Sequence, residues 1–132
     1  MPRNRRRLLH ITVVADNPET VDGLTAYFNQ ADAPAHGARA LREVAEMPAS
    51  TTAVVLFPDD FAFTEVITTL DAIRRRRPQL LVVLVTREPH RFEAACERSG
   101  EAVPVLLLPK PSFGWSILDA VRSHAVPDRS WQ

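Results

Sequence analysis

Short runs of consecutive apolar residues alternate along the chain with longer stretches in which apolar residues recur every three or four positions. A short continuous run predicts a strand that is buried on both faces of a sheet, and the three-to-four spacing predicts a helix packed on that sheet. Strands are therefore expected at 8–15, 33–40, 53–57, 80–85 and 103–108. Helices are expected at 17–31, 40–47, 63–77, 88–99 and around 117–121.

Local signals support several of these boundaries. Asn17 is suited to cap the first helix, with Pro18 in its first turn. The third helix ends in four arginines and is stopped by Pro78. The segment 33–40 has no β-branched residue, which predicts a short or irregular edge strand. Pro104 removes a hydrogen-bond donor from the last strand and so confines that strand to a sheet edge.

The alternation of strands and helices, joined by short links, predicts an α/β fold. Parallel strands need crossover connections, and right-handed crossovers place helices on both faces of the sheet. We therefore expect a three-layer, doubly wound domain with a parallel five-stranded sheet, in which the run at 53–57 is central. This single domain is expected at 8–125, between a flexible basic arm at 1–7 and a C-terminal tail at 126–132.

Composition narrows the classes of partner. The 132 residues carry 16 basic and 16 acidic side chains, so no global field attracts polyanions, and a nucleic acid partner is not expected. The single cysteine, Cys96, excludes an internal disulfide and suits a reducing compartment. No apolar stretch approaches the roughly 20 residues of a membrane span. A cytoplasmic domain with no membrane partner is expected.

Four motifs, in order, resemble the receiver domain of bacterial response regulators (CheY-like) over essentially the whole chain. They are VVADNP after the first strand, GARAL before the second helix, the arginine run and proline that lead into LLVVLVT, and LLLPKP followed by Phe113. The resemblance implies the flavodoxin-like strand order 2-1-3-4-5, with a pocket at the ends of strands 1, 3, 4 and 5. In that family a central aspartate takes a phosphoryl group from a histidine kinase, helped by Mg²⁺.

Part of the family's pocket is retained in this sequence. Asp16 matches the second acid of the metal-binding pair, with Asn17 beside it. Thr86 matches the hydroxyl and Lys110 the lysine that hold the phosphoryl group, and the resemblance implies a cis bond between Lys110 and Pro111. We expect Lys110, the one lysine of the chain, to form an internal ion pair with Asp16 or Asp59.

Three positions depart from the family pattern. Ala15 stands where the first acid of the pair would be, Phe57 stands at the phosphoacceptor, and Leu107 stands at the aromatic that switches on activation. Neither alanine nor phenylalanine can be phosphorylated or bind a metal ion. We therefore expect no metal site and no cofactor, and we expect Phe57 to be buried packing.

Two carboxylates follow the central strand closely. Asp59 and Asp60 are either displaced phosphoacceptors or loop acids that end the strand, and turn-type carboxylates after a proline favour the second interpretation. A shift of two extended residues at about 3.3 Å each would place the Asp59 carboxylate too far away to share the geometry of Thr86 and Lys110 without remodelling of the chain.

Other chemistry has weaker support. The four histidines lack ligand spacing, so a metal site is not expected from them. No glycine lies in the turn after the first strand, which argues against a dinucleotide loop. The arginines at 74–77 suit a solvated helix end, and Cys96 suits the core of the helix at 88–99.

The leading hypothesis is a degenerate receiver, a pseudo-receiver, that acts as a phosphorylation-independent interaction module in signal transduction and is not an enzyme. Its partner would be a signalling protein (a kinase or an effector) or a second copy of the chain. The alternatives are a receiver phosphorylated on Asp59 or Asp60, and a flavodoxin-like binder of a small anion near Lys110 and Thr86. The expected interface is the face made by the helix at 88–99, the last strand and the last helix. Its expected members are Arg87, Arg91, Leu107 and Trp115.

Overall fold

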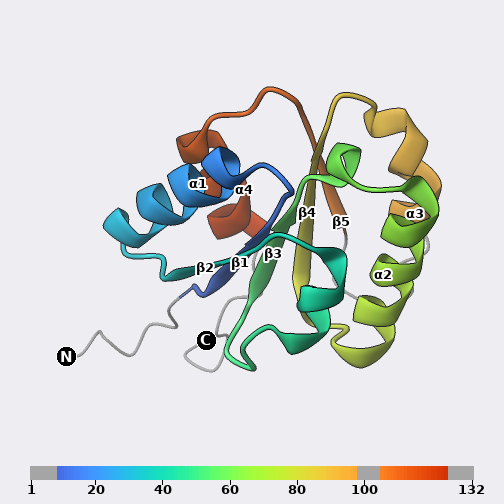
Figure 1. The fold of residues 1–132 in the computed structure, drawn as a ribbon, viewed down its shortest axis with the longest axis horizontal. Helices are drawn as coiled ribbons and strands as arrows, with labels where there is room; N and C mark the ends of the chain where they lie inside the picture. The colour runs from blue at the N-terminus through green and yellow to red at the C-terminus, as the bar shows by residue number, and fades with distance from the viewer. Residues whose placement is uncertain (1–8, 98–104, 125–132) are drawn as a thin grey trace.

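The sheet has five parallel strands in the order β2-β1-β3-β4-β5 (Figure 1). The computed structural model describes residues 9–97 and 105–124. The strands are β1 (Ile11–Val14), β2 (Ala35–Ala38), β3 (Ala53–Leu56), β4 (Leu81–Thr86) and β5 (Val105–Pro109). The predicted strand order is confirmed, with β3 central and with β2 and β5 at the two edges. All residues of β1, β3 and β4 are buried, as their continuous apolar runs predict.

Helices cover both faces of the sheet (Figure 1). The α-helices are α1 (Pro18–Gln30), α2 (Phe63–Arg76), α3 (Glu93–Glu97) and α4 (Gly114–His124). Three 3₁₀ segments join them, namely η2 (Leu41–Glu46), η3 (Pro58–Asp60) and η4 (Pro89–Phe92). One core cluster lies under α1 and α4, and the other lies under η2, α2 and η4. Within the described residues, no helix is long and apolar enough to cross a membrane.

Local sequence signals explain where the first two long helices begin and end. The Asn17 side chain accepts hydrogen bonds from the backbone N–H of Glu19 (2.7 Å) and of Thr20 (3.3 Å), which satisfies two free donors at the start of α1. In α2, which ends at Arg76 just before Pro78, the buried residues are Val66, Leu70 and Ile73. The predicted stop at the proline is confirmed.

The close approach of β2 to α1 explains the glycine in the second motif. A Cβ atom added at Gly37 would overlap Val21 of α1. A larger residue would therefore push the edge strand away from the helix. β2 is short, as its lack of β-branched residues predicts.

Two helices differ from the sequence prediction. Residues 41–46 form a 3₁₀ helix, with three residues per turn. The helix expected at 88–99 is divided into η4 and the five-residue α3, and Pro89 lies in the first turn of η4. Phe92 is buried there, and Cys96, expected in the core, is partly buried and packs against it. The end of the helix expected at 88–99, the strand residue Pro104 and the two terminal segments lie outside the described residues.

Candidate functional site

The candidate site lies at the carboxyl ends of β1, β3, β4 and β5, and this side of the sheet is called the carboxyl edge. In open α/β sheets, ligands bind at this carboxyl edge. Asp16 lies two residues after β1, Phe57 directly follows β3, Thr86 ends β4 and Lys110 directly follows β5. The fold therefore brings these sequence-predicted residues to one edge.

Phe57 occupies the centre of this edge. The residue is 6% exposed, and its side chain belongs to the same buried cluster as Ala15 and the inward-facing valines of β1, β3 and β4. Its backbone N–H donates to the carbonyl oxygen of Val14 at 2.9 Å, which continues the pairing of β3 with β1. The prediction that Phe57 is buried packing is confirmed.

Asp59 reaches Thr86. The Thr86 hydroxyl donates to Oδ1 of Asp59 at 2.6 Å, and the backbone N–H of Arg87 donates to Oδ2 at 2.9 Å. The expectation that Asp59 lies too far away to share the geometry of Thr86 and Lys110 is wrong for Thr86, while Asp59 makes no ion pair with Lys110. Residues 58–60 form a 3₁₀ turn, which rises only about 2.0 Å per residue and turns the chain back toward β4.

The Thr86 hydroxyl both donates and accepts a hydrogen bond. Besides donating to Asp59, its oxygen accepts from the backbone N–H of Glu88 at 3.0 Å. The residue is 0% exposed. A hydroxyl that already donates its proton and already accepts an N–H offers little to a further ligand.

Asp60 ties the end of β3 to the end of β1. Its Oδ2 accepts from the backbone N–H of Asp16 at 2.9 Å, and the Asp16 carbonyl oxygen accepts from Nε of Arg39 at 2.8 Å. Within the described part of the chain, no three His, Cys, Asp or Glu side chains gather closely enough to hold a metal ion. Asn17, the neighbour of Asp16, uses its side-chain oxygen to cap α1.

Lys110 is placed differently from the prediction. Among the described residues, no carboxylate lies within ion-pair distance of its ammonium group, so the expected pair with Asp16 or Asp59 is wrong. The Nζ atom instead lies 5.7 Å from the centre of the Phe57 ring. The Phe57 ring thus lies near the cation, while Asp59 bonds to Thr86 and Arg87. The Lys110–Pro111 peptide bond is cis, as the resemblance implies.

Of the residues expected at an interface, Arg87, Arg91 and Trp115 are exposed, while Leu107 is partly buried against the core. Arg91 lies over the Phe63 ring of α2 at 4.5 Å and pairs with Glu88 at 3.3 Å. Trp115, on α4, is 64% exposed and stacks on Phe113 with 6.2 Å between ring centres. Arg91 and Trp115 thus lie on segments that cover opposite faces of the sheet (Figure 1).

Sequence reasoning missed two features of this edge. One is the contact between Asp59 and Thr86, for which the local signal is only the turn-forming run Pro58-Asp59-Asp60. The other is the stacked pair of exposed aromatics at the start of α4. Its signal in the sequence is the spacing of Phe113 and Trp115 on either side of Gly114. Gly114 itself packs closely on α1, because a Cβ atom added there would lie 2.9 Å from the Tyr27 ring.

Comparison with known proteins gives matches in structure only. No protein-family model matches the chain. No curated protein matches it by sequence.

Three solved structures illustrate the likeness. A CheY-like response regulator receiver domain protein from Methanospirillum hungatei JF-1 matches with a TM-score of 0.70 and 15% identity, over 88% of this chain and 92% of that one. The signal receiver domain of an HD domain-containing protein from Pseudomonas fluorescens Pf-5 matches with a TM-score of 0.68 and 22% identity, over 89% and 87%.

A structure described as an adenylate cyclase from Rhodopirellula baltica matches with a TM-score of 0.74 and 13% identity, over 89% of this chain and 87% of that one. At these identities the likeness is one of fold. The strand order agrees with these structures, and the chain has the fold of response regulator receiver domains.

Proposed function

We propose that this chain is a pseudo-receiver, a non-enzymatic signalling module that binds another protein without being phosphorylated. The observation that carries the proposal is the buried Phe57 at the end of the central strand. Phosphoryl transfer to a protein requires a nucleophile, and a phenyl ring has none. Its burial in the same core cluster as Ala15 also leaves the centre of the site closed to a substrate.

The Asp59 carboxylate supports the same proposal. In a working receiver the new phosphoryl group draws the site's hydroxyl inward, and the interaction face changes with it. Here a carboxylate of the chain itself already holds the Thr86 hydroxyl, and the neighbouring Arg87 N–H, by hydrogen bonds of 2.6 and 2.9 Å. A ligand that never binds shifts no equilibrium, so the interaction face would keep one state.

A second candidate is phosphorylation of Asp59 itself. Its exposure and its contact with Thr86 favour it, because a displaced acceptor would need that hydroxyl. Against it, both carboxylate oxygens are already hydrogen-bonded, and Lys110 makes no ion pair with any described carboxylate. Asp60 is less suited, since its Oδ2 bonds to the backbone of Asp16.

A flavodoxin-like binder of small anions has less support. An anion at this edge would need donors, and the Thr86 hydroxyl and the Arg87 N–H both donate to Asp59. Lys110 alone is a weak basis for an anion site, because one partly exposed charge gives little binding energy.

For the interaction face we propose the surface that runs around the β5 edge of the sheet, from η4 and α3 on one face to α4 on the other. Its exposed members are Arg87, Arg91 and Trp115, and Leu107 of β5 is partly buried between them. The partner is a signalling protein, a kinase or an effector, or a second copy of the chain. Aromatic and arginine side chains are the residues that protein interfaces favour.

The deciding experiment is incubation with acetyl phosphate and Mg²⁺, followed by intact-mass measurement. We expect no mass increase of one phosphoryl group, while a working receiver treated in parallel gains one. A phosphoryl group on this chain that disappears in Asp59→Asn would overturn the proposal and establish the second candidate. The control variant is Asp119→Asn, which changes an exposed carboxylate on α4.

A further inference from the structure

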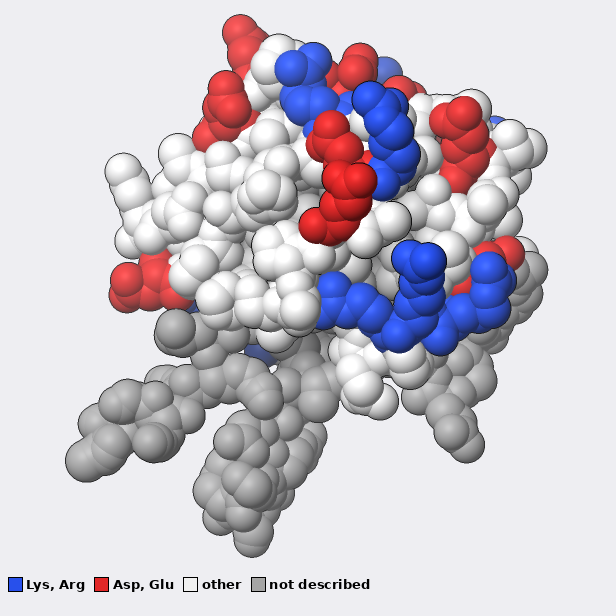
Figure 2. Space-filling view, turned by 60° about the horizontal axis from the view of Figure 1, so that its bottom comes forward, with Lys and Arg blue, Asp and Glu red and all other residues white. Residues whose placement is uncertain are grey.

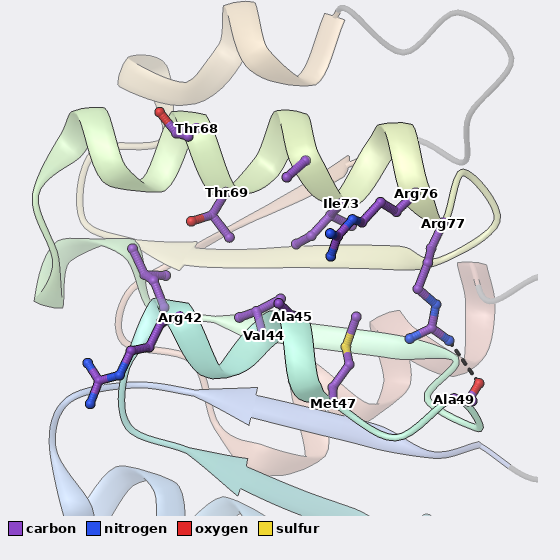
Figure 3. A pocket seen from close by; sticks show the side chains of 12 residues that line it. Arg42, Val44, Ala45, Met47, Ala49, Thr68, Thr69, Ile73, Arg76 and Arg77 are labelled. Atoms are coloured by element: carbon purple, nitrogen blue, oxygen red, sulfur yellow. Dashed lines mark hydrogen bonds between the residues drawn. The ribbon is translucent and has the colours of Figure 1, made fainter.

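A groove of about 440 Å³ lies between η2 and α2, away from the carboxyl-edge site (Figure 3). Its size falls within the range of about 300–1,000 Å³ that is usual for ligand pockets. Small side chains leave this space open, since Ala45 and Ala49 on one side face Thr68, Thr69 and Ala72 on the other. The apolar floor includes Val44 and Ile73, which belong to the core.

The 3₁₀ form of η2 decides which of its side chains face the groove. With three residues per turn, side chains at i and i+3 eclipse each other. Leu41, Val44 and Met47 therefore share one face, and Arg42 and Ala45 share the next, and all five line the groove. The glutamates at 43 and 46 share the third face and do not line it.

Arginines stand at both ends of the groove. Arg42 lies at one end, and Arg76 and Arg77 lie at the other (Figure 3). Among the residues that the structure describes, no acidic side chain lines the space between them. Figure 2 shows the lower end of the molecule in Figure 1, where basic side chains adjoin one another in a row, with acidic side chains elsewhere on the same face.

The three arginines are not equivalent. The Arg77 guanidinium is used within the fold, because it donates to the carbonyl oxygens of Pro48 (3.4 Å), Ala49 (3.0 Å) and Thr51 (2.7 Å). Arg42 and Arg76 are exposed, and in the described part of the chain their guanidinium groups make neither an ion pair nor a hydrogen bond. These two cations are available to a partner.

From this arrangement we infer that the groove binds an acidic amphipathic helix of a partner protein. The occupant is a helix because both walls are helices whose backbone groups are bonded internally except at their ends, so the groove offers no strand edge to an extended peptide. From Thr68 to Arg76 the groove runs roughly 12 Å along α2, which is just over two turns of a docked helix.

The chemistry of that helix follows from the lining. Its apolar side chains lie on Leu41, Val44 and Ile73, and carboxylates about eight residues apart pair with Arg42 and Arg76. This inference goes beyond the proposed function, because it names a different surface and does not depend on whether Asp59 can be phosphorylated.

The test uses the full chain and a synthetic helical peptide as probe. The peptide has blocked ends, about 15 residues, leucines at helical spacing on one face, and glutamates about eight positions apart. We expect saturable binding in fluorescence anisotropy that weakens as salt rises, and amide shifts in the NMR spectrum of the ¹⁵N-labelled chain that concentrate in η2 and α2. A peptide with lysines in place of the glutamates should bind at least about tenfold more weakly.

Variants locate the site. Arg42→Glu combined with Arg76→Glu should weaken peptide binding about tenfold or more, and Ala45→Trp should block the groove. Ala45 is exposed, so the tryptophan fills the groove without crowding the core. The matched control is Arg75→Glu, an exposed position of α2 that does not line the groove, and it should change affinity less than about twofold.

Several results would overturn the inference. One is the absence of saturable binding up to about 1 mM peptide. Another is a set of amide shifts that maps to the aromatic residues at the start of α4. A third is an equal loss of peptide affinity in Arg75→Glu and in the double variant. Shifts in η2 and α2 that grow with protein concentration in the absence of peptide would assign the groove to a second copy of the chain. That outcome would also contradict it.

Discussion

The hydroxyl of Thr86 donates a hydrogen bond of 2.6 Å to the carboxylate of Asp59, a residue 27 positions earlier in the chain. The other oxygen of the same carboxylate accepts from the Arg87 backbone N–H at 2.9 Å. One side chain of the 3₁₀ turn after β3 thus satisfies a hydroxyl and an amide at the end of β4. This side chain thus links β3 and β4 at the carboxyl edge of the sheet, where receiver domains are phosphorylated.

Replacing Asp59 with alanine should destabilise this edge. The variant loses two charge-assisted hydrogen bonds and leaves the buried Thr86 hydroxyl without its acceptor, so we expect a loss of about 1–2 kcal/mol in the free energy of unfolding. Urea unfolding measures that loss, and faster hydrogen exchange at the Arg87 amide would locate it. Asp119→Ala, an exposed change on α4, should stay within about 0.5 kcal/mol of the parent. Equal stability of the two variants would contradict the expectation.

Replacing Phe57 with aspartate should be costly. The variant loses a buried ring and places a carboxylate in the same core cluster as Ala15. The Lys110 ammonium, 5.7 Å from the centre of the Phe57 ring, offsets only part of the desolvation, so we expect a loss of about 3–5 kcal/mol in the free energy of unfolding. Phe113→Asp, at a residue that is 65% exposed, is the matched control and should cost far less. If Phe57→Asp is as stable as the parent and accepts a phosphoryl group, then the site is open and only its nucleophile was lost.

Mg²⁺ should bind weakly to the chain. The ion prefers near-octahedral oxygen coordination, and Ala15 stands beside Asp16 where a second carboxylate would be needed. Trp115 fluorescence reports binding in a Trp131→Phe background, and we expect no saturable change at submillimolar Mg²⁺. A saturable change that is abolished by Asp16→Asn would show that a metal site exists.

Arg77 should contribute to stability through its guanidinium. It donates to the carbonyl oxygens of Pro48, Ala49 and Thr51, and so fastens the segment before β3 to the end of α2. Arg77→Met keeps an apolar stem but removes these bonds, and we expect a loss of about 1–2 kcal/mol by urea unfolding. Arg75→Met, on the exposed side of the same helix, should be neutral. A neutral Arg77→Met would show that these hydrogen bonds add nothing beyond solvation by water.

Self-association through the face of α3, β5 and α4 should weaken in Arg91→Glu and in Trp115→Ala. Both side chains are exposed, so each variant should keep the fold, with a cost of at most about 1 kcal/mol from the lost contacts to Phe63 and Phe113. Sedimentation velocity over a concentration series measures association, and circular dichroism checks the fold. A dimer whose crosslinks map to η2 and α2 would argue against this face.

Local patterns in the sequence were enough to predict much of the fold. The apolar runs predict β1, β3 and β4, because a strand buried on both faces needs apolar residues at every position. The cap at Asn17 and the stop before Pro78 are also local, since they depend on neighbouring backbone groups. The burial of Phe57 follows from its place directly after a buried central strand.

Only the tertiary structure decided which side chains contact one another at the carboxyl-edge site and which residues line the groove. The position of the Asp59 carboxylate depends on a 3₁₀ turn and on a partner 27 residues away, and neither is encoded in the spacing of apolar residues. Lys110 lies near the Phe57 ring because β3 and β5 end at the same side of the sheet. The groove exists because η2 is a 3₁₀ helix that lies beside small residues of α2. Sequence periodicity specifies which face of an element is buried. Contacts between distant side chains depend on how the elements pack, and that is settled only when the chain is folded.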